Sequence, residues 1–197
     1  MLDEALALVE ERGHVAFTLR EVARRIGVSH AAPYRHFADK RAVMTALAAQ
    51  GSDELAARIR VALAAAGDDL RVRFLAAGLA YVRFALDRRA LFQVMFSGEK
   101  DPDDPRAKAA EAECFGILLA FVAEAQRAEA FPPGDPLAVA TPIWAMHHGL
   151  ATLAAAGSFA AHGPKGLRRV VDDAHARLLD GLMTGCSSPA ALRGCRR

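Results

Sequence analysis

Apolar residues recur along this chain at intervals of three and four, the spacing that gathers side chains on one face of an α-helix. The pattern is clearest at Leu19, Val22, Ala23 and Ile26. No stretch alternates as a strand would, and aromatic residues make up only 7% of an alanine-dominated composition. Because alanine and leucine lose little free energy on entering a helix, we predict an all-α protein of about nine helices.

Glycine and proline divide the 197 residues into helical segments. We expect a first helix from about Leu2 to Gly13, two short helices over 18–26 and 29–37, and a long fourth helix over 39–66 that Gly51 can kink. Five longer segments follow, at Asp69–Leu86, Arg89–Phe96, Pro105–Ala128, Pro136–Ala156 and Pro164–Gly185. This predicts a three-helix head (1–48), joined by the fourth helix to a helical bundle (67–185), and a flexible tail (186–197).

The formal net charge of +2 is near neutral, but residues 18–41 hold six arginine and lysine side chains against two carboxylates, a local charge of +4. Such a stretch suits a nucleic-acid surface or, equally well, a solvated helix face. The three cysteines, Cys114, Cys186 and Cys195, lack the paired spacing of a metal site and predict a reducing compartment. No signal peptide is visible and the most apolar stretch is too short to span a bilayer, so we expect a soluble cytoplasmic protein without a membrane partner.

Residues 18–37 have the layout of a helix-turn-helix. Thr18 and Glu21 form the pattern of a capping box, and Gly27 ends the helix that they begin. Ser29 can cap a second helix running to about Phe37, and Asp39 can cap the next. A helix-turn-helix places the start of its second helix in the major groove of DNA, although ordinary helical hairpins share this spacing.

The sequence "FTLREVARRIGVSHAAPYRHFADKRAV" also resembles the DNA-binding signature of the TetR family, and the resemblance covers about residues 2–47. It implies DNA contacts from Thr18, Ser29, His30, Ala31, Ala32, Tyr34, Arg35, His36 and Lys40. Thr18, Tyr34, His36 and Lys40 are expected on phosphates, whereas His30, Ala31 and Ala32 are expected on base edges. Ile26, Val28 and Phe37 are expected in the core, Arg20 and Arg24 in solvent, and Pro33 in the first helical turn, where its missing amide is tolerated.

Two later stretches, "AYVRFALDRRALFQVMFS" and "IWAMHHGLATL", resemble the WHG-type C-terminal domain of TetR-like regulators, and Trp144, His148 and Gly149 match its letters. The resemblance implies a pocket for a small-molecule effector, and its expected lining is Phe84, Phe92, Met95, Phe96, Trp144, His147 and His148. The alternative is ordinary core packing, above all for Trp144. Adjacent His147 and His148 point about 100° apart on a helix and cannot easily share an ion, so we expect no metal and no cofactor. No nucleophile and base lie at useful spacing, so we expect no enzymatic activity.

The last two predicted helices carry apolar and small side chains suited to a four-helix dimer interface, or alternatively to an internal core. The expected interface residues are Ile143, Leu150, Leu153, Leu167, Val171, Ala174, Leu178 and Leu182. The resemblance therefore implies a homodimer that binds operator DNA at recognition segments about 34–36 Å apart and, most simply, represses transcription until a small molecule releases it. The alternative function is a helical small-molecule carrier whose head no longer binds DNA.

Overall fold

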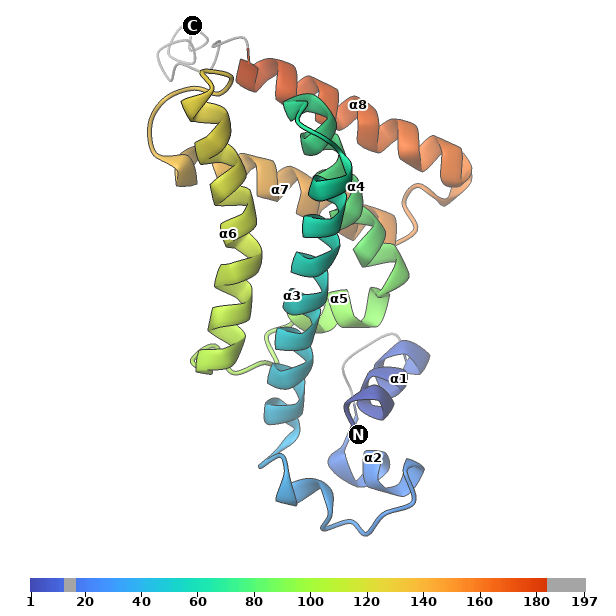
Figure 1. The fold of residues 1–197 in the computed structure, drawn as a ribbon. Helices are drawn as coiled ribbons and strands as arrows, with labels where there is room; N and C mark the ends of the chain where they lie inside the picture. Colours follow the sequence, from blue (N-terminus) through green and yellow to red (C-terminus); the bar gives the residue numbers. More distant parts are fainter. Residues whose placement is uncertain (13–16, 184–197) are drawn as a thin grey trace, which may run out of the picture. The chain divides into compact units, whose positions relative to one another are not determined.

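A computed structural model describes residues 1–12 and 17–183. In this part of the chain all regular secondary structure is helical, as expected (Figure 1). It contains eight α-helices and two short 3₁₀ turns. The elements are α1 (Leu2–Arg12), α2 (Leu19–Arg25), η1 (Pro33–Arg35), α3 (Lys40–Ala65), α4 (Leu70–Asp87), α5 (Arg89–Met95), α6 (Pro105–Arg127), α7 (Pro136–Ala155), η2 (Ala160–His162) and α8 (Gly163–Met183). The predicted stop of the first helix at Gly13 and the predicted tail 186–197 lie outside the described residues.

The chain forms two compact units that are interleaved along the sequence. Unit 1 comprises residues 1–57 and 84–114, and unit 2 comprises residues 58–83 and 115–197. Helices α3, α4 and α6 each begin in one unit and end in the other. Unit 1 therefore holds the predicted head together with α5 and the start of α6, whereas unit 2 holds α7 and α8.

The first half of the predicted helix-turn-helix forms as expected, because its signals act between neighbours in the sequence. Thr18 and Glu21 make both hydrogen bonds of a capping box at the start of α2. Gly27 has a φ of +72°, a conformation that glycine adopts without the steric cost of a Cβ atom. The chain leaves α2 in a tight turn at this residue.

The second half is shorter than expected, and the helix predicted over 29–37 reduces to the single turn η1. Pro33 occupies the first position of η1. It has no amide hydrogen, so it cannot donate the hydrogen bond to Ser29 O that an α-helix would require. The backbone bonds here include Arg35 N to Ala32 O and Phe37 N to Pro33 O. The expectation of a full helix is therefore wrong, and one helix fewer than predicted is found in the described residues.

Two apolar side chains of this segment are not in the core, contrary to expectation. Ile26 is 39% exposed and Val28 42% exposed, and Phe37 is only half-buried. A one-turn recognition segment packs less surface onto α2 than a full helix would, because fewer side chains face it. The apolar residues beside the turn consequently remain at the surface.

The core of unit 1 is built on α3, which runs without interruption through Gly51. A Cβ atom at Gly51 would lie 2.6 Å from the Met95 sulfur and 3.1 Å from Leu91 Cγ. The glycine therefore permits close packing of α3 on α5 and does not break the helix, so the expected kink is absent. Ala49, Ala107 and Ala110 form a second close contact, between α3 and α6.

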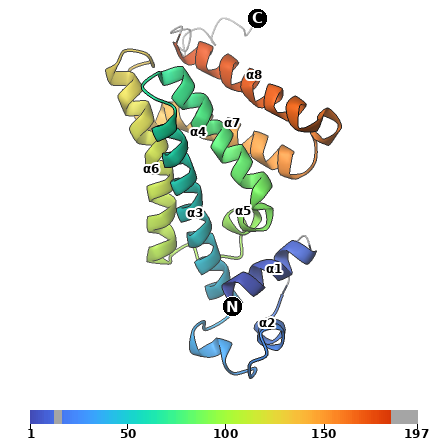
Figure 2. The ribbon, with the colours of Figure 1, turned by 45° about the vertical axis from the view of Figure 1, so that its right-hand side comes forward.

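Unit 2 has an aromatic core contributed by α4, α6, α7 and α8, whose courses are visible in Figure 2. Phe74, Phe121 and Phe131 lie with ring centroids 6.1 to 6.4 Å apart, within the range of favourable edge and offset contacts. Ile143 and Leu179 complete this core and are almost fully buried. Over residues 1–12 and 17–183, no helix is both long and apolar enough to span a membrane.

Candidate nucleic-acid interface

The segment that joins α2 to α3 presents most of the predicted DNA-contacting side chains to solvent. Tyr34 is 52% exposed, and Ser29, His30, Ala31, Arg35 and His36 are also exposed, whereas Ala32 is half-buried. The side chain of Pro33 is buried, so η1 is anchored at one point and open on its other side. The segment is accessible to a large ligand such as a duplex.

Ion pairs divide the cations around this segment into two groups. Arg12 contacts Glu21 at 2.6 Å, and Arg25 pairs with both Glu4 and Glu11. These contacts raise the pKa of the Arg25 guanidinium, chiefly through its hydrogen bonds to Glu11. Two of the cations therefore tie α1 to α2 and are not directed to an outside partner.

Arg20, Arg24 and Arg35 belong to the second group. All three are exposed, and none has an ion-pair partner among the residues that the structure describes. Unpaired exposed arginines are the side chains that can bind phosphates without first breaking a contact. Arg20 and Arg24, which the sequence placed in solvent, therefore join Arg35 as candidate phosphate ligands.

Thr18 caps α2 in the structure, and the phosphate contact expected at this helix start stays a prediction. Its amide donates to Glu21 Oε2 at 2.8 Å, and its hydroxyl donates to the same oxygen at 3.1 Å. The Glu21 carboxylate also binds Arg12, and these hydrogen bonds lower the pKa of Glu21 to about 2. The donors of Thr18 are therefore occupied by a side chain that stays anionic at neutral pH, and Thr18 acts as a helix cap.

Lys40, at the start of α3, is held by a residue far away in the sequence. Its Nζ atom lies 2.8 Å from Glu99 Oε2 and 5.6 Å from the centroid of the Phe17 ring. The next residue, Arg41, contacts Asp101 at 3.7 Å. Both acidic residues belong to the segment between α5 and α6, so this acidic segment pairs with two of the cations closest to the candidate interface.

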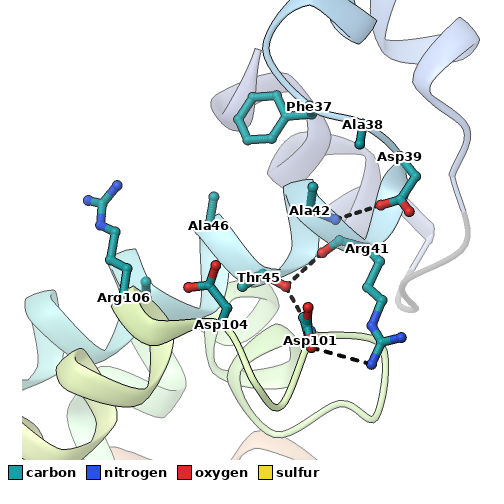
Figure 3. A pocket seen from close by; sticks show the side chains of 11 residues that line it. Phe37, Ala38, Asp39, Arg41, Ala42, Thr45, Ala46, Asp101, Asp104 and Arg106 are labelled. Atoms are coloured by element: carbon teal, nitrogen blue, oxygen red, sulfur yellow. Dashed lines mark hydrogen bonds and ion pairs between the residues drawn. The ribbon is translucent and has the colours of Figure 1, made fainter.

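Figure 3 shows how the same acidic segment is fastened to α3. The Thr45 hydroxyl donates to Arg41 O at 2.8 Å and accepts from the Asp101 amide at 2.8 Å. The Asp39 carboxylate accepts from the Ala42 amide at 2.9 Å, which confirms Asp39 as the predicted cap of this helix. These hydrogen bonds fix the position of the acidic segment against the first turns of α3.

These side chains line a hollow of about 380 Å³ within unit 1. Its wall carries Arg41 and Arg106 as well as Asp39, Asp101 and Asp104, so charges of both signs face it. In Figure 3, the Arg106 side chain extends from α6 on the side of the hollow away from Asp101. Charged side chains and alanines line this hollow, so it differs from the aromatic-lined pocket that the sequence suggested.

The seven residues expected to line an effector pocket are divided between the two units. In unit 1, Phe84, Phe92 and Met95 are buried in the core, whereas Phe96 is 44% exposed and its ring centroid lies 4.9 Å from that of Phe92. This is the packing that the alternative interpretation expected of them.

In unit 2, Trp144 is not the core residue that the alternative interpretation made it. It is 38% exposed. Its indole meets the Phe115 ring edge-on at 6.2 Å and lies tilted against the His148 ring at 5.6 Å. His148 Nδ1 shares a hydrogen bond of 3.1 Å with the Tyr81 hydroxyl, and burial lowers the pKa of His148. His147 points elsewhere, into the core, where it is 7% exposed.

The residues expected at a dimer interface fall into two sets. Ile143, Val171 and Leu182 are buried within their own unit, so their side chains cannot meet a partner chain. The other five reach the surface to different degrees: Leu153 is 49% exposed, and Leu150, Leu167, Ala174 and Leu178 are half-buried.

Comparison with protein families finds two matches that together span most of the chain. Residues 1–47 match the family described as bacterial regulatory proteins, tetR family, and residues 74–180 match the tetracyclin repressor-like C-terminal domain. The chain belongs to the TetR family. It is therefore a DNA-binding transcriptional regulator with a helix-turn-helix, from a family of regulators that are not enzymes.

Solved structures support this assignment. A Rhodococcus sp. RHA1 protein of unknown function is 36% identical, with a TM-score of 0.81 over 92% of this chain and 93% of that one. The TetR family regulator PfmR from Thermus thermophilus shares the fold at 22% identity, with a TM-score of 0.71 over 92% and 97% of the two chains. A single-residue variant of TetR from Acinetobacter baumannii AYE, solved in complex with minocycline, does so at 24% identity, with a TM-score of 0.65 over 95% and 96%. The comparison with curated proteins found no match.

Proposed function

We propose that this TetR family regulator is a homodimeric repressor that binds operator DNA through the segment between α2 and α3 and dissociates when a small molecule binds to its C-terminal domain. The observation that carries the proposal is the segment Ser29–His36, most of whose side chains are exposed, together with the unpaired Arg20, Arg24 and Arg35. Tyr34 and the arginines bind phosphates in this proposal, and His30 and Ala31 approach base edges.

Dimer formation is proposed through the apolar side chains that α7 exposes from Trp144 to Leu153, together with those of α8. Leu153 and Trp144 are 49% and 38% exposed, and exposed apolar groups of this size are typical of surfaces that bind a partner. A second chain would cover them and present a second recognition segment to the next turn of the duplex.

Release by a small molecule follows from linkage in this proposal. A ligand that binds only the DNA-incompetent state draws the population into that state, whereas a ligand with equal affinity for both states changes nothing. Support comes from the similar fold of the TetR variant from Acinetobacter baumannii, which was solved with minocycline bound. Helix α3 begins in unit 1 and ends in unit 2. In this proposal it is the continuous element that connects the DNA site to the effector site.

The decisive experiment selects bound fragments from genomic DNA and then titrates the best fragment against salt. A regulator with six to ten phosphate contacts loses roughly 10³ to 10⁵-fold in affinity between 50 and 200 mM salt. We expect Arg35→Ala to weaken binding and to lower the salt slope by about 1 for each head. Arg127→Ala, which removes an exposed arginine from unit 2, should change neither quantity.

Two results would contradict the proposal. Absence of fragment enrichment would favour the small-molecule carrier instead. A salt slope that is the same in wild type, Arg35→Ala and Arg127→Ala would show that the phosphates are bound elsewhere on the chain.

A further inference from the structure

Two histidines from different helices meet ring to ring in the core of unit 2. His147 lies on α7 and His175 on α8, and their Nε2 atoms are 2.6 Å apart. His147 is 7% exposed and His175 is fully buried. Neither residue contributes to the proposed DNA contacts, and the expected effector pocket included His147 but not His175.

The remaining ring nitrogens determine where the hydrogens of this pair lie. His147 Nδ1 lies 2.7 Å from Ile143 O, and His175 Nδ1 lies 2.6 Å from Val171 O. A carbonyl oxygen only accepts, so each Nδ1 must carry a hydrogen. In the neutral form of both rings, each Nε2 then presents a lone pair, and the two lone pairs point at each other.

Three hydrogen-bonding contacts are therefore present, but two neutral imidazoles supply only two hydrogens. A third hydrogen would make the pair a cation. Burial opposes a cation here, because a charge in an apolar core is costly without an opposite charge beside it. The junction of the two neutral rings is thus an electron-rich site that can bind an electron-pair acceptor.

The surroundings do little to favour a proton. Phe74 from α4 packs on both rings, with centroids 5.7 and 5.6 Å away, and the Tyr81 ring lies 6.3 Å from His147. The Tyr81 hydroxyl is directed to His148. On α8, the charged side chains nearest to His175 in the sequence, Asp172 and Arg168, are paired with each other at 2.7 Å.

We propose that His147 and His175 form a binding site for one transition-metal ion of the class that neutral imidazole prefers, such as Zn²⁺ or Cu²⁺. Metal-binding histidines characteristically donate their other ring hydrogen to a backbone carbonyl or carboxylate, which orients the ring and fixes the free lone pair. Both histidines have this arrangement. Bundle proteins also build metal sites from inward side chains of facing helices.

Metal binding requires a small opening of the pair. Nitrogen ligands lie at about 2.0–2.1 Å from Zn²⁺, so a tetrahedral angle separates two of them by about 3.3 Å. Gly78 forms the wall here: a Cβ atom on it would lie 1.9 Å from His175 Nε2 and 2.2 Å from His147 Nε2. In residues 1–12 and 17–183, no cluster of three or more His, Cys, Asp or Glu side chains is arranged to hold a metal. The ion would take its further ligands from water or a bound small molecule.

The test titrates chelator-treated, full-length protein with Zn²⁺ and with Cu²⁺ at pH 7.5 by isothermal calorimetry. We expect one ion per chain and a rise in melting temperature that depends on metal concentration. His147→Phe and His175→Phe each keep an aromatic ring in the core but remove one Nε2. Each should weaken metal binding at least about ten-fold, because loss of a residue that only supports a ligand already costs about that much.

His148→Phe is the matched control, because it alters the neighbouring residue of the same helix without touching the pair. It should bind metal as the wild type does. Three outcomes would overturn the proposal. They are no metal binding by the wild type, metal binding that survives in both Phe variants, and protonation of the His147–His175 pair without any uptake of metal. The wild-type measurement decides even where a variant is poorly folded, and it does not depend on whether the protein binds DNA.

Discussion

The ion pair between Lys40 and Glu99 leads to the most specific prediction about DNA affinity. Lys40 is expected to bind a phosphate from the first turn of α3, yet its Nζ atom already lies 2.8 Å from Glu99 Oε2. A phosphate must compete with this carboxylate for the same ammonium group. Replacing Glu99 with glutamine removes the competitor's charge while it keeps the shape of the side chain, so Glu99→Gln should strengthen DNA binding.

The exposure of the pair sets the size of the effect. The side chains of Lys40 and Glu99 are 30% and 47% exposed, and exposed ion pairs contribute about 0.2–1 kcal/mol. Because 1.4 kcal/mol corresponds to a factor of ten, each head should gain about 1.4-fold to 5-fold in affinity. A dimer with two heads on DNA should gain roughly the square of this factor, about 2-fold to 25-fold.

The assay is fluorescence anisotropy with an operator fragment at several salt concentrations. Asp103→Asn serves as the control, because Asp103 belongs to the same segment, is 86% exposed and pairs with Lys108 of α6. The control measures the general benefit of removing one negative charge. If Glu99→Gln gains no more affinity than Asp103→Asn, or if its gain does not shrink as salt screens the pair, the competition is refuted.

Three further predictions concern unit 2. Gly78→Ala should lower the free energy of unfolding by about 3 kcal/mol in urea titrations, because the new Cβ overlaps both His147 and His175; a loss below about 0.5 kcal/mol would contradict the close packing. In metal-free protein, stability should fall as pH is lowered from about 6.5 to 5, by up to about 1.4 kcal/mol per pH unit for each histidine, because the pKa of each is lowered on folding; a constant unfolding free energy over this range would argue against it. Leu153→Glu should convert the proposed dimer to a monomer in sedimentation experiments, whereas Leu137→Glu, in the first turn of the same helix and 51% exposed, should not.

Sequence alone determined the features whose causes lie within a few residues of one another. The capping box of Thr18 and Glu21, the cap at Asp39 and the all-helical fold were all predicted and found. The last five helices begin close to their predicted limits, and the first four of them also end close to them, whereas the predicted end of the fifth at Gly185 lies outside the described residues. The physical reason is that helix formation depends on spacing of three or four residues and on hydrogen bonds of the first and last turns.

The recognition segment shows where local signals were insufficient. Ser29 and the apolar residues around it predicted a full helix, but Pro33 left one turn. Pro33 is visible in the sequence. Whether residues 29–32 before it become a helix depends on how much apolar surface they can bury, which the sequence does not show. Val28 remains 42% exposed, so this segment buries little apolar surface there.

Contacts between distant residues were decided only by the tertiary structure. Lys40 and Glu99 are 59 positions apart, and His147 and His175 are 28 apart; no periodicity relates either pair. As a possible metal ligand, His147 was weighed only against its sequence neighbour His148, whereas packing of α8 on α7 places His175 beside it. Hydrogen bonds and ion pairs of this kind depend on which helix faces meet, and those faces are chosen by burial of the whole core, which no short stretch of residues specifies.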